Sequence, residues 1–319
     1  MKALAFQEHG GLEAQRRLAE GRPFGKISFG LVVVADWSAA SARGPVRPAR
    51  DRCWIAWGRA GEGRPEPRYF RTRPEAEDFI RDLLAGEPGA ALVGFDFAFG
   101  YPADAGLPGG RALCARLAGL IRDEPEGSNN RFEVAGSLNR EIQAAFGGGF
   151  DGPFWGHPAG REYPDLRPTR PRPFPPRISD GRLVERRLAS RRIQSPWKLF
   201  TRASVGSQTL LGLAAVHRLL TDPRLAARAR LWPFETGWDA AVGPDRIVVA
   251  ELWPSLVDCR DQPYPIKDAC QVAAVRDWAL NTPEALGRSL ARPPDLTDEE
   301  ERIAREREGW ILPMLECTP

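Results

Sequence analysis

Residues 31–41 read LVVVADWSAAS and decide how the rest of the chain is interpreted. A leucine, three valines and an alanine precede Asp36, and small residues follow Trp37. This pattern predicts a buried strand that ends at an aspartate and leads into a loop. A second stretch of the same kind, AALVGFDFAFGYP over residues 90–102, predicts another strand, which ends at Asp96 before a Gly-Tyr-Pro turn.

The remaining elements are predicted from alternating apolar residues, amphipathic spacing, and start and stop signals. Further strands are expected at residues 51–60, 67–74, 231–237 and 246–256. Helices are expected at residues 74–86, 109–122, 131–146, 209–222, 266–281 and 296–308. The predicted fold class is therefore α/β, with a mixed sheet flanked by helices.

Two segments stand apart from this pattern. Residues 1–28 predict a polar leader. Residues 147–195 hold seven prolines between Pro158 and Pro176 and ten arginines between Arg161 and Arg192, with almost no apolar periodicity. Because such a segment cannot build its own core, we expect an irregular, arginine-lined flap beside the acidic strand ends. The predicted organisation is a leader followed by one domain over residues 29–319, interrupted by this Pro/Arg-rich insertion.

Composition narrows the class of protein. A chain of 319 residues with 42% apolar residues, 27% charged residues and ten tryptophans is typical of a packed globular protein. No apolar run approaches the ~20 residues of a transmembrane helix, and the N-terminus lacks the apolar core of a secretory signal. We therefore expect a soluble, cytoplasmic protein without a membrane partner. Five scattered cysteines without a CxxC pair argue against a disulfide framework or a structural zinc site.

Three predicted strands each carry one carboxylate at or near the C-terminal end, namely Asp36, Asp96 and Glu251. Ligands of α/β sheets gather beyond the carboxyl ends of the strands, so we expect these three side chains to converge and share one cation. A divalent cation would compensate the cost of placing carboxylates in apolar surroundings. Oxygen ligands without His or Cys favour Mg²⁺ or Mn²⁺ over Zn²⁺. The alternative is that each carboxylate caps a turn or pairs with an arginine.

Four motifs occur in a fixed order: Asp36 in ADWS, Asp96 in GFDFAFGYP, Glu251 in AELWPSL and Asp268 in IKDACQVAA. Together they resemble the predicted RNase-H-like nuclease family that is catalogued as a domain of unknown function. The resemblance spans residues 32–311 outside the insertion, and the closing EREGWIL is similar to the usual end of the family. It implies a sheet whose first strand carries the central metal ligand, with Glu251 facing it and the Asp268 helix crossing the edge.

The resemblance implies a metal-dependent nuclease or phosphodiesterase, in which two cations bridge a phosphate and activate water. Asp36, Asp96 and Glu251 would be metal ligands, and Asp268 a ligand or the general base. Relatives often carry a further Asp at the place of Gln271, which puts two-metal catalysis in doubt. Two other functions stay open. One is a nucleotide- or phosphate-handling protein, because some long, insertion-bearing members are labelled for molybdopterin guanine dinucleotide synthesis. The other is a non-catalytic binding module of the same fold.

Residues 195–208, SPWKLFTRASVGSQ, lead into a predicted helix and carry the candidate substrate-binding residues Lys198, Arg202, Ser207 and Gln208. A helix start offers backbone N–H groups and a positive dipole to a phosphate, and basic side chains add charge. The GxxxxGK[ST] spacing of a nucleotide P-loop is absent, and an ordinary helix start with exposed basic residues is the alternative.

Nucleic acid or a nucleotide is the partner that these patterns suggest. The arginines of residues 161–192, with the aromatic residues near them, suit a phosphate backbone and stacked bases. Pro/Arg-rich surface loops are also common in arginine-rich proteins, and the net charge of only +3 does not decide between the two. The oligomeric state is not indicated by any pattern.

Overall fold

The computed structural model describes residues 29–188, 194–201, 204–238 and 243–313. Within these ranges seven strands form one mixed sheet, in the order β3-β2-β1-β4-β6-β5 with β7 paired to β6. The strands are β1 (Leu31–Asp36), β2 (Cys53–Arg59), β3 (Arg68–Phe70), β4 (Ala91–Phe95), β5 (Ala229–Leu231), β6 (Ile247–Leu252) and β7 (Ile311–Leu312). Strands β1, β2 and β3 pair antiparallel, whereas β4, β6, β5 and β7 extend the sheet from β1 in parallel.

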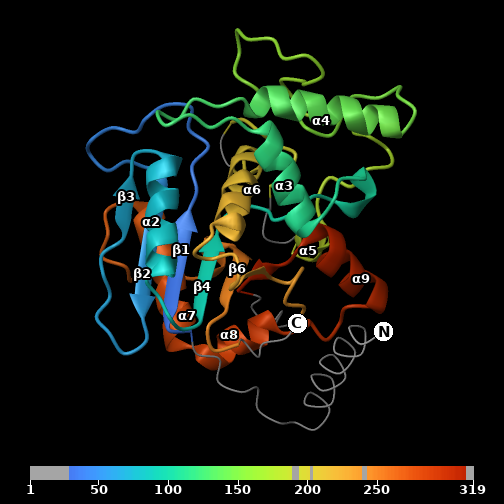
Figure 1. The fold of residues 1–319 in the computed structure, drawn as a ribbon. Coiled ribbons are helices and arrows are strands. Elements are labelled where there is room, and N and C mark those ends of the chain that lie inside the picture. Colours follow the sequence, from blue (N-terminus) through green and yellow to red (C-terminus); the bar gives the residue numbers. More distant parts are fainter. Residues whose placement is uncertain (1–28, 189–193, 202–203, 239–242, 314–319) are drawn as a thin grey trace.

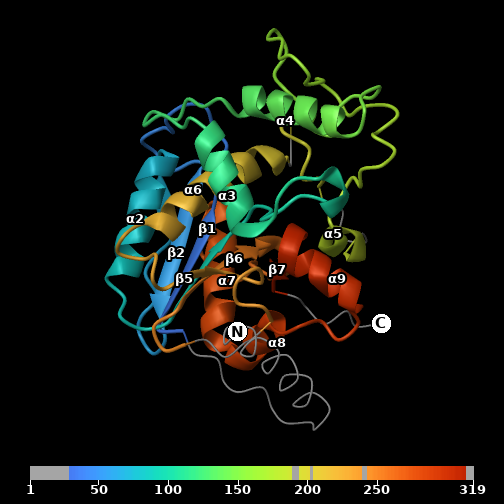
Figure 2. The same cartoon turned by 45° about the vertical axis from the view of Figure 1, so that its right-hand side comes forward.

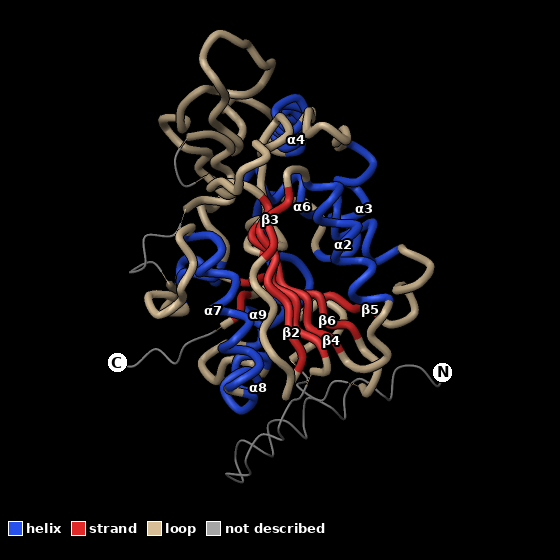
Figure 3. Tube along the Cα trace, turned by 90° about the vertical axis from the view of Figure 1, so that its left-hand side faces the viewer, coloured by secondary structure: helices blue, strands red, loops and turns tan. Residues whose placement is uncertain are grey.

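Helices cover both faces of the sheet (Figure 1). They are α2 (Arg73–Ala85), α3 (Gly110–Leu120), α4 (Arg131–Ala145), α5 (Leu183–Arg187), α6 (Gly206–Thr221), α7 (Lys267–Asn281), α8 (Pro283–Leu290) and α9 (Asp298–Ile303), which continues as a π-helical turn, η4 (Ala304–Glu308). Figure 3 shows the layers edge-on, with α2, α3 and α6 on one side of the strands and α7 and α8 on the other.

The apolar alternation of the strands divides the core in two. In β1, Leu31 and Val33 belong to one buried cluster, whereas Val32 and Val34 belong to the other. This is the period of two that a strand buried on both faces requires, because successive side chains leave by opposite faces. In β1, odd-numbered residues therefore lie on one face of the sheet and even-numbered residues on the other.

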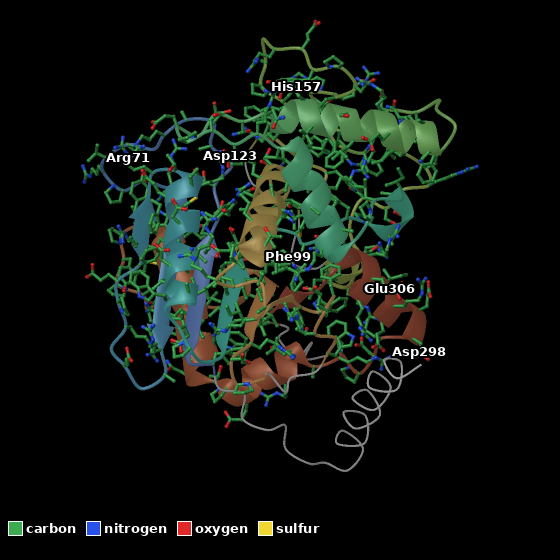
Figure 4. All side chains as sticks on the ribbon, in the orientation of Figure 1. Arg71, Phe99, Asp123, His157, Asp298 and Glu306 are labelled. Atoms are coloured by element: carbon green, nitrogen blue, oxygen red, sulfur yellow. The ribbon has the colours of Figure 1, made fainter. Side chains whose placement is uncertain are left out.

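The carboxyl ends of β1 and β4 point toward α4 (Figure 1). The long loop after β1 lies at this end, and residues 147–182 lie there as well. Figure 4 labels Asp123 and His157 in this part of the molecule, and Phe99 nearer its middle. The loop after β1 and the segment next to α4 therefore lie beyond the end of the sheet at which Asp36 and Asp96 were predicted to act.

Two glycines fix helix α6 against its neighbours. A Cβ atom at Gly212 would lie 2.2 Å from the ring of Phe97, so only glycine allows the helix to approach the sheet this closely. A Cβ atom at Gly206 would lie 2.5 Å from the carbonyl oxygen of Pro196. The position of the α6 N-terminus is therefore set by close backbone packing.

The predicted α/β class and the mixed, helix-flanked sheet are confirmed. Strand β5 ends at Leu231, so the prediction of a strand over 231–237 is wrong: most of those residues form turns. Pro233 lacks an N–H group and cannot continue a ladder. Helix α8 and strand β7 were not predicted, because they are short and lack a long apolar period. The predicted leader lies outside the described residues.

Residues 147–188 have little regular structure apart from α5. Their apolar side chains Phe154, Leu166 and Ile178 are buried in the main core instead of forming one of their own. Asn139 of α4 holds the segment by donating hydrogen bonds to the carbonyl oxygens of Phe154 at 2.9 Å and Asp165 at 2.7 Å. None of the helices in the described ranges combines the length and apolar character that crossing a bilayer requires.

Candidate functional site

Asp36 and Asp96 lie side by side at the carboxyl ends of two adjacent strands. Strands β1 and β4 are parallel with Ala35 opposite Phe95, so the next residue of each strand is an aspartate. The Asp96 amide donates to the carbonyl oxygen of Ala35 at 3.2 Å, and the Trp37 amide donates to Asp96 Oδ1 at 2.7 Å. A hydrogen bond between the two carboxyl groups joins them directly.

The surroundings of this pair favour its protonated form. Burial raises the pKa of Asp36 well above its ordinary value, and the negative charges of Asp96 and Asp268 raise it further. Burial also raises the pKa of Asp96, to about 6, although hydrogen bonds from Asp36 and Trp37 oppose that change. No basic group of the described chain forms an ion pair with either aspartate. We therefore expect the pair to hold a shared proton, because two full charges would repel.

Asp268 and Asp51 add negative charge beside the pair. Asp268 lies in the first turn of α7, and its Oδ2 accepts a hydrogen bond from the Asp51 amide at 2.8 Å. Asp51 has a left-handed backbone (φ 55°), and its carbonyl oxygen accepts a hydrogen bond from Ser38 Oγ at 2.9 Å. Asp51 was not predicted from the sequence as a residue of this site. Its position at the start of a strand antiparallel to β1 was the available signal, because such a residue lies beside the end of β1.

Glu251 does not join this group, and the prediction that it shares a cation with Asp36 and Asp96 is wrong. Strands β4 and β6 are parallel with Phe95 opposite Glu251, and Phe95 is also opposite Ala35. Glu251 therefore leaves the sheet on the face of Ala35, whereas Asp36, one residue further on, leaves by the opposite face. The expectation from the family resemblance that Glu251 faces the first-strand aspartate fails for the same reason.

Arg182 pairs with Glu251 in place of a cation. Its Nη1 and Nη2 donate to the two Glu251 oxygens at 2.7 and 2.6 Å, and both side chains are buried. The amide of Phe99 donates to the same carboxylate at 2.8 Å. Burial raises the pKa of Glu251, and the charge of Arg182 opposes that rise. The alternative that a strand-end carboxylate pairs with an arginine therefore holds for Glu251.

The oxygen donors at Asp36 and Asp96 suit a hard divalent cation. Within the part of the chain that the structure describes, no three or more His, Cys, Asp or Glu side chains are arranged as a complete metal cage. Mg²⁺ does not require one, because it is commonly held by one or two carboxylates with water and substrate phosphate completing its coordination. Asp36 and Asp96, two partly exposed residues whose carboxylates have no basic partner in the described ranges, fit that requirement.

The candidate substrate-binding residues are only partly brought together. Ser207 Oγ donates to the Leu199 carbonyl oxygen at 2.6 Å and accepts from Arg131 Nε at 2.9 Å. Gln208 lies next to it, and no described residue forms a hydrogen bond with its buried Oε1. Lys198 is directed elsewhere, with Nζ 3.2 Å from Gln194 Oε1. Arg202 lies outside the described residues.

Comparison of the chain with family models, curated proteins and solved structures finds no match. The roles of Asp36, Asp96 and Asp268 are therefore argued from their geometry and charge alone.

Several arginines of residues 147–188, which the sequence analysis considered for nucleic-acid contact, already have partners. Arg167 pairs with Asp151 at 2.9 Å, and Arg170 pairs with Asp180 at 3.2 Å. Arg170 also lies 4.6 Å from the centre of the Phe174 ring. Helix α5 lies beside α9 (Figure 2), where Arg187 pairs with Asp295 and Glu300. These pairs hold the segment in place, and none of them links it to Asp36 or Asp96.

Proposed function

We propose that this chain is a divalent-metal-dependent phosphodiester hydrolase of RNase-H-like fold, with Asp36 and Asp96 as its metal ligands. The observation that supports this proposal is a pair of adjacent carboxyl groups at parallel strand ends, with raised pKa values and no basic partner. Perturbed carboxyl groups of this kind gather at functional sites. The central place of β1, which carries Asp36, also supports an RNase-H-like sheet.

A bound Mg²⁺ or Mn²⁺ would polarise a phosphoryl oxygen and lower the pKa of a bound water. Asp36 and Asp96 would give up their shared proton to hold it, since metal ligands must be deprotonated. The Trp37 amide fixes the orientation of Asp96. Asp268 uses Oδ2 to hold the Asp51 amide, and no donor among the described residues occupies its Oδ1. Asp268 therefore remains the candidate general base, while Glu251 has no part in the reaction.

The substrate class that fits is a phosphodiester of nucleic acid or a nucleotide, because a hard cation binds phosphate oxygens. Asp36→Asn tests the proposal, because it removes one ligand charge and keeps the shape of the side chain. We expect Mg²⁺- or Mn²⁺-dependent cleavage of oligonucleotides or nucleotides to fall by about a thousandfold, since metal catalysis supplies several kcal/mol. The matched control is Asp78→Asn on the exposed face of α2, which should cleave like the wild type.

Equal cleavage by wild type and Asp36→Asn, or cleavage that EDTA does not reduce, would contradict the proposal. Metal-dependent binding of nucleic acid without any cleavage would favour the non-catalytic module instead. Stabilisation by one nucleotide, again without cleavage, would favour a nucleotide-handling protein. Folding of both variants is checked by circular dichroism before the assay.

A further inference from the structure

Arg131 differs from the other buried arginines of the molecule. Four arginines are buried in the described chain, and the exposed fraction of Arg131 is 7%. Arg73 pairs with Asp123, Arg182 with Glu251, and Arg276 with Asp277. Arg131 has no carboxylate partner among the described residues. A buried charge of this kind is costly unless something compensates it.

The hydrogen bonds of Arg131 go to neutral groups only. Its Nε donates to Ser207 Oγ at 2.9 Å, and its Nη1 donates to Ser41 Oγ at 2.7 Å and to Asn129 Oδ1 at 2.6 Å. No described group accepts a hydrogen bond from Nη2. Burial and the charge of Arg73 lower the pKa of Arg131 to about 10, so it is still positively charged at neutral pH.

The same guanidinium lies at the start of a long helix. Ser207 is the second residue of α6 (Gly206–Thr221), and no side chain caps this helix. The Gly206 amide donates to the Lys198 carbonyl oxygen, but the amides of Ser207 and Gln208 donate to no described group. Unsatisfied amides and the helix dipole attract an anion to such an end.

We propose that Arg131 and the Ser207 and Gln208 amides of α6 bind a phosphate group. The guanidinium supplies the charge, and the free Nη2 and the two amides supply donors that a tetrahedral oxyanion accepts. The identification of this anion as a substrate phosphate rests on the proposed function; the binding site itself does not.

The loop after β1 connects this site to the acidic pair. Arg73 Nη1 donates to the carbonyl oxygens of Ser38 at 3.1 Å and Ala40 at 2.7 Å. Ser41, the next residue, accepts from Arg131. A phosphate at Arg131 and a cation at Asp36 would therefore lie at the two ends of one short, firmly held loop. This arrangement suits a substrate with more than one phosphate, such as a nucleic-acid strand.

The test is a calorimetric titration of the full-length protein with inorganic phosphate, at low salt and in EDTA. We expect saturable binding by the wild type and at least about tenfold weaker binding by Arg131→Gln, because a hydrogen bond to a charged group contributes about that factor. Arg140→Gln is the matched control. It lies on the same helix, is exposed and pairs with Asp165, so phosphate binding should be unchanged. No binding by the wild type, or equal binding by Arg131→Gln, would overturn the inference.

Arg131→Gln could fail to fold, because it removes buried hydrogen bonds. In that event, soaking wild-type crystals with tungstate decides the question: density in contact with Arg131 Nη2 supports the site, and its absence there refutes it. A short oligonucleotide in EDTA should displace inorganic phosphate; if it does not, the site is not a substrate subsite. Asp36→Asn should keep phosphate binding whatever its effect on cleavage. If this variant cleaves like the wild type, the proposed function fails while the phosphate site stands. If the wild type binds no phosphate, this inference fails while the proposed function stands.

Discussion

Asp36 and Glu251 stand at the carboxyl ends of strands that are separated in the sheet only by β4, yet they are neutralised differently. Glu251 is buried and held by both terminal nitrogens of Arg182. Asp36 is partly exposed and lies beside Asp96, with two further aspartates nearby that raise its pKa. Carboxylates at the same end of the sheet are thus paired with an arginine on one face and left without a basic partner among the described residues on the other. Of the two, only Asp36 can accept a cation without first breaking an ion pair.

The largest effect on stability is expected at the buried ion pair of Arg182 and Glu251. Arg182→Met should lower the free energy of unfolding by about 3 to 5 kcal/mol, because it leaves Glu251 buried without its partner. Urea denaturation measures this change. The control is Arg170→Met, whose ion pair with Asp180 is about half exposed and should change stability by less than about 0.5 kcal/mol. Adding Glu251→Leu to Arg182→Met should restore part of the loss; no restoration would show that Arg182 acts through its other contacts.

The second effect is a pH dependence of the stability that Asp36 and Asp96 contribute. The folded pKa values of Asp36 and Asp96 lie above the unfolded value, so this contribution to stability is full at low pH and is lost as pH rises, for Asp96 through about 6. Without metal, the free energy of unfolding of the wild type should fall between pH 4 and pH 7, relative to that of Asp36→Asn, by on the order of 2 kcal/mol. Parallel profiles for the two proteins would show that the pair shares no proton.

The same experiment with Mg²⁺ sharpens the comparison. Metal binding competes with the proton, so added Mg²⁺ should stabilise the wild type more at pH 8 than at pH 5. Asp36→Asn should lose most of this stabilisation. Arg170→Met should keep it, because Arg170 pairs with Asp180 and not with either member of the acidic pair.

The smallest effect is expected at Asp51. Its charge is the last of the causes that raise the pKa of Asp36. Asp51→Asn keeps the backbone amide that Asp268 accepts from, and asparagine tolerates the left-handed backbone at this position. We therefore expect a small downward shift in the pKa of Asp36, measured by NMR titration and reduced by salt. A shift as large as that caused by Asp96→Asn would mean that Asp51 belongs to the pair itself.

The sequence was sufficient for the strands that carry Asp36 and Asp96, because their apolar runs are long and end at the aspartates. It was not sufficient for Glu251, whose face depends on its alignment with Phe95 across the sheet. A shift of one residue in that alignment would reverse the face, and no local pattern specifies it. The partner Arg182 lies 69 positions away in an irregular segment, so its pairing could not be predicted from periodicity.

Gly212 has a consequence for any substrate that uses both the acidic pair and the α6 N-terminus. Since a Cβ atom there would overlap the Phe97 ring, glycine is what lets α6 pack directly against this ring. We expect this packing to keep the interval between the Ser207 amide and Asp96 constant, so that a substrate bound at both positions would be selected by its length. A constant spacing of this kind would select ligands by the distance between their charged groups and not by their bases. The protein would then accept different nucleotide sequences but would reject backbones of the wrong length.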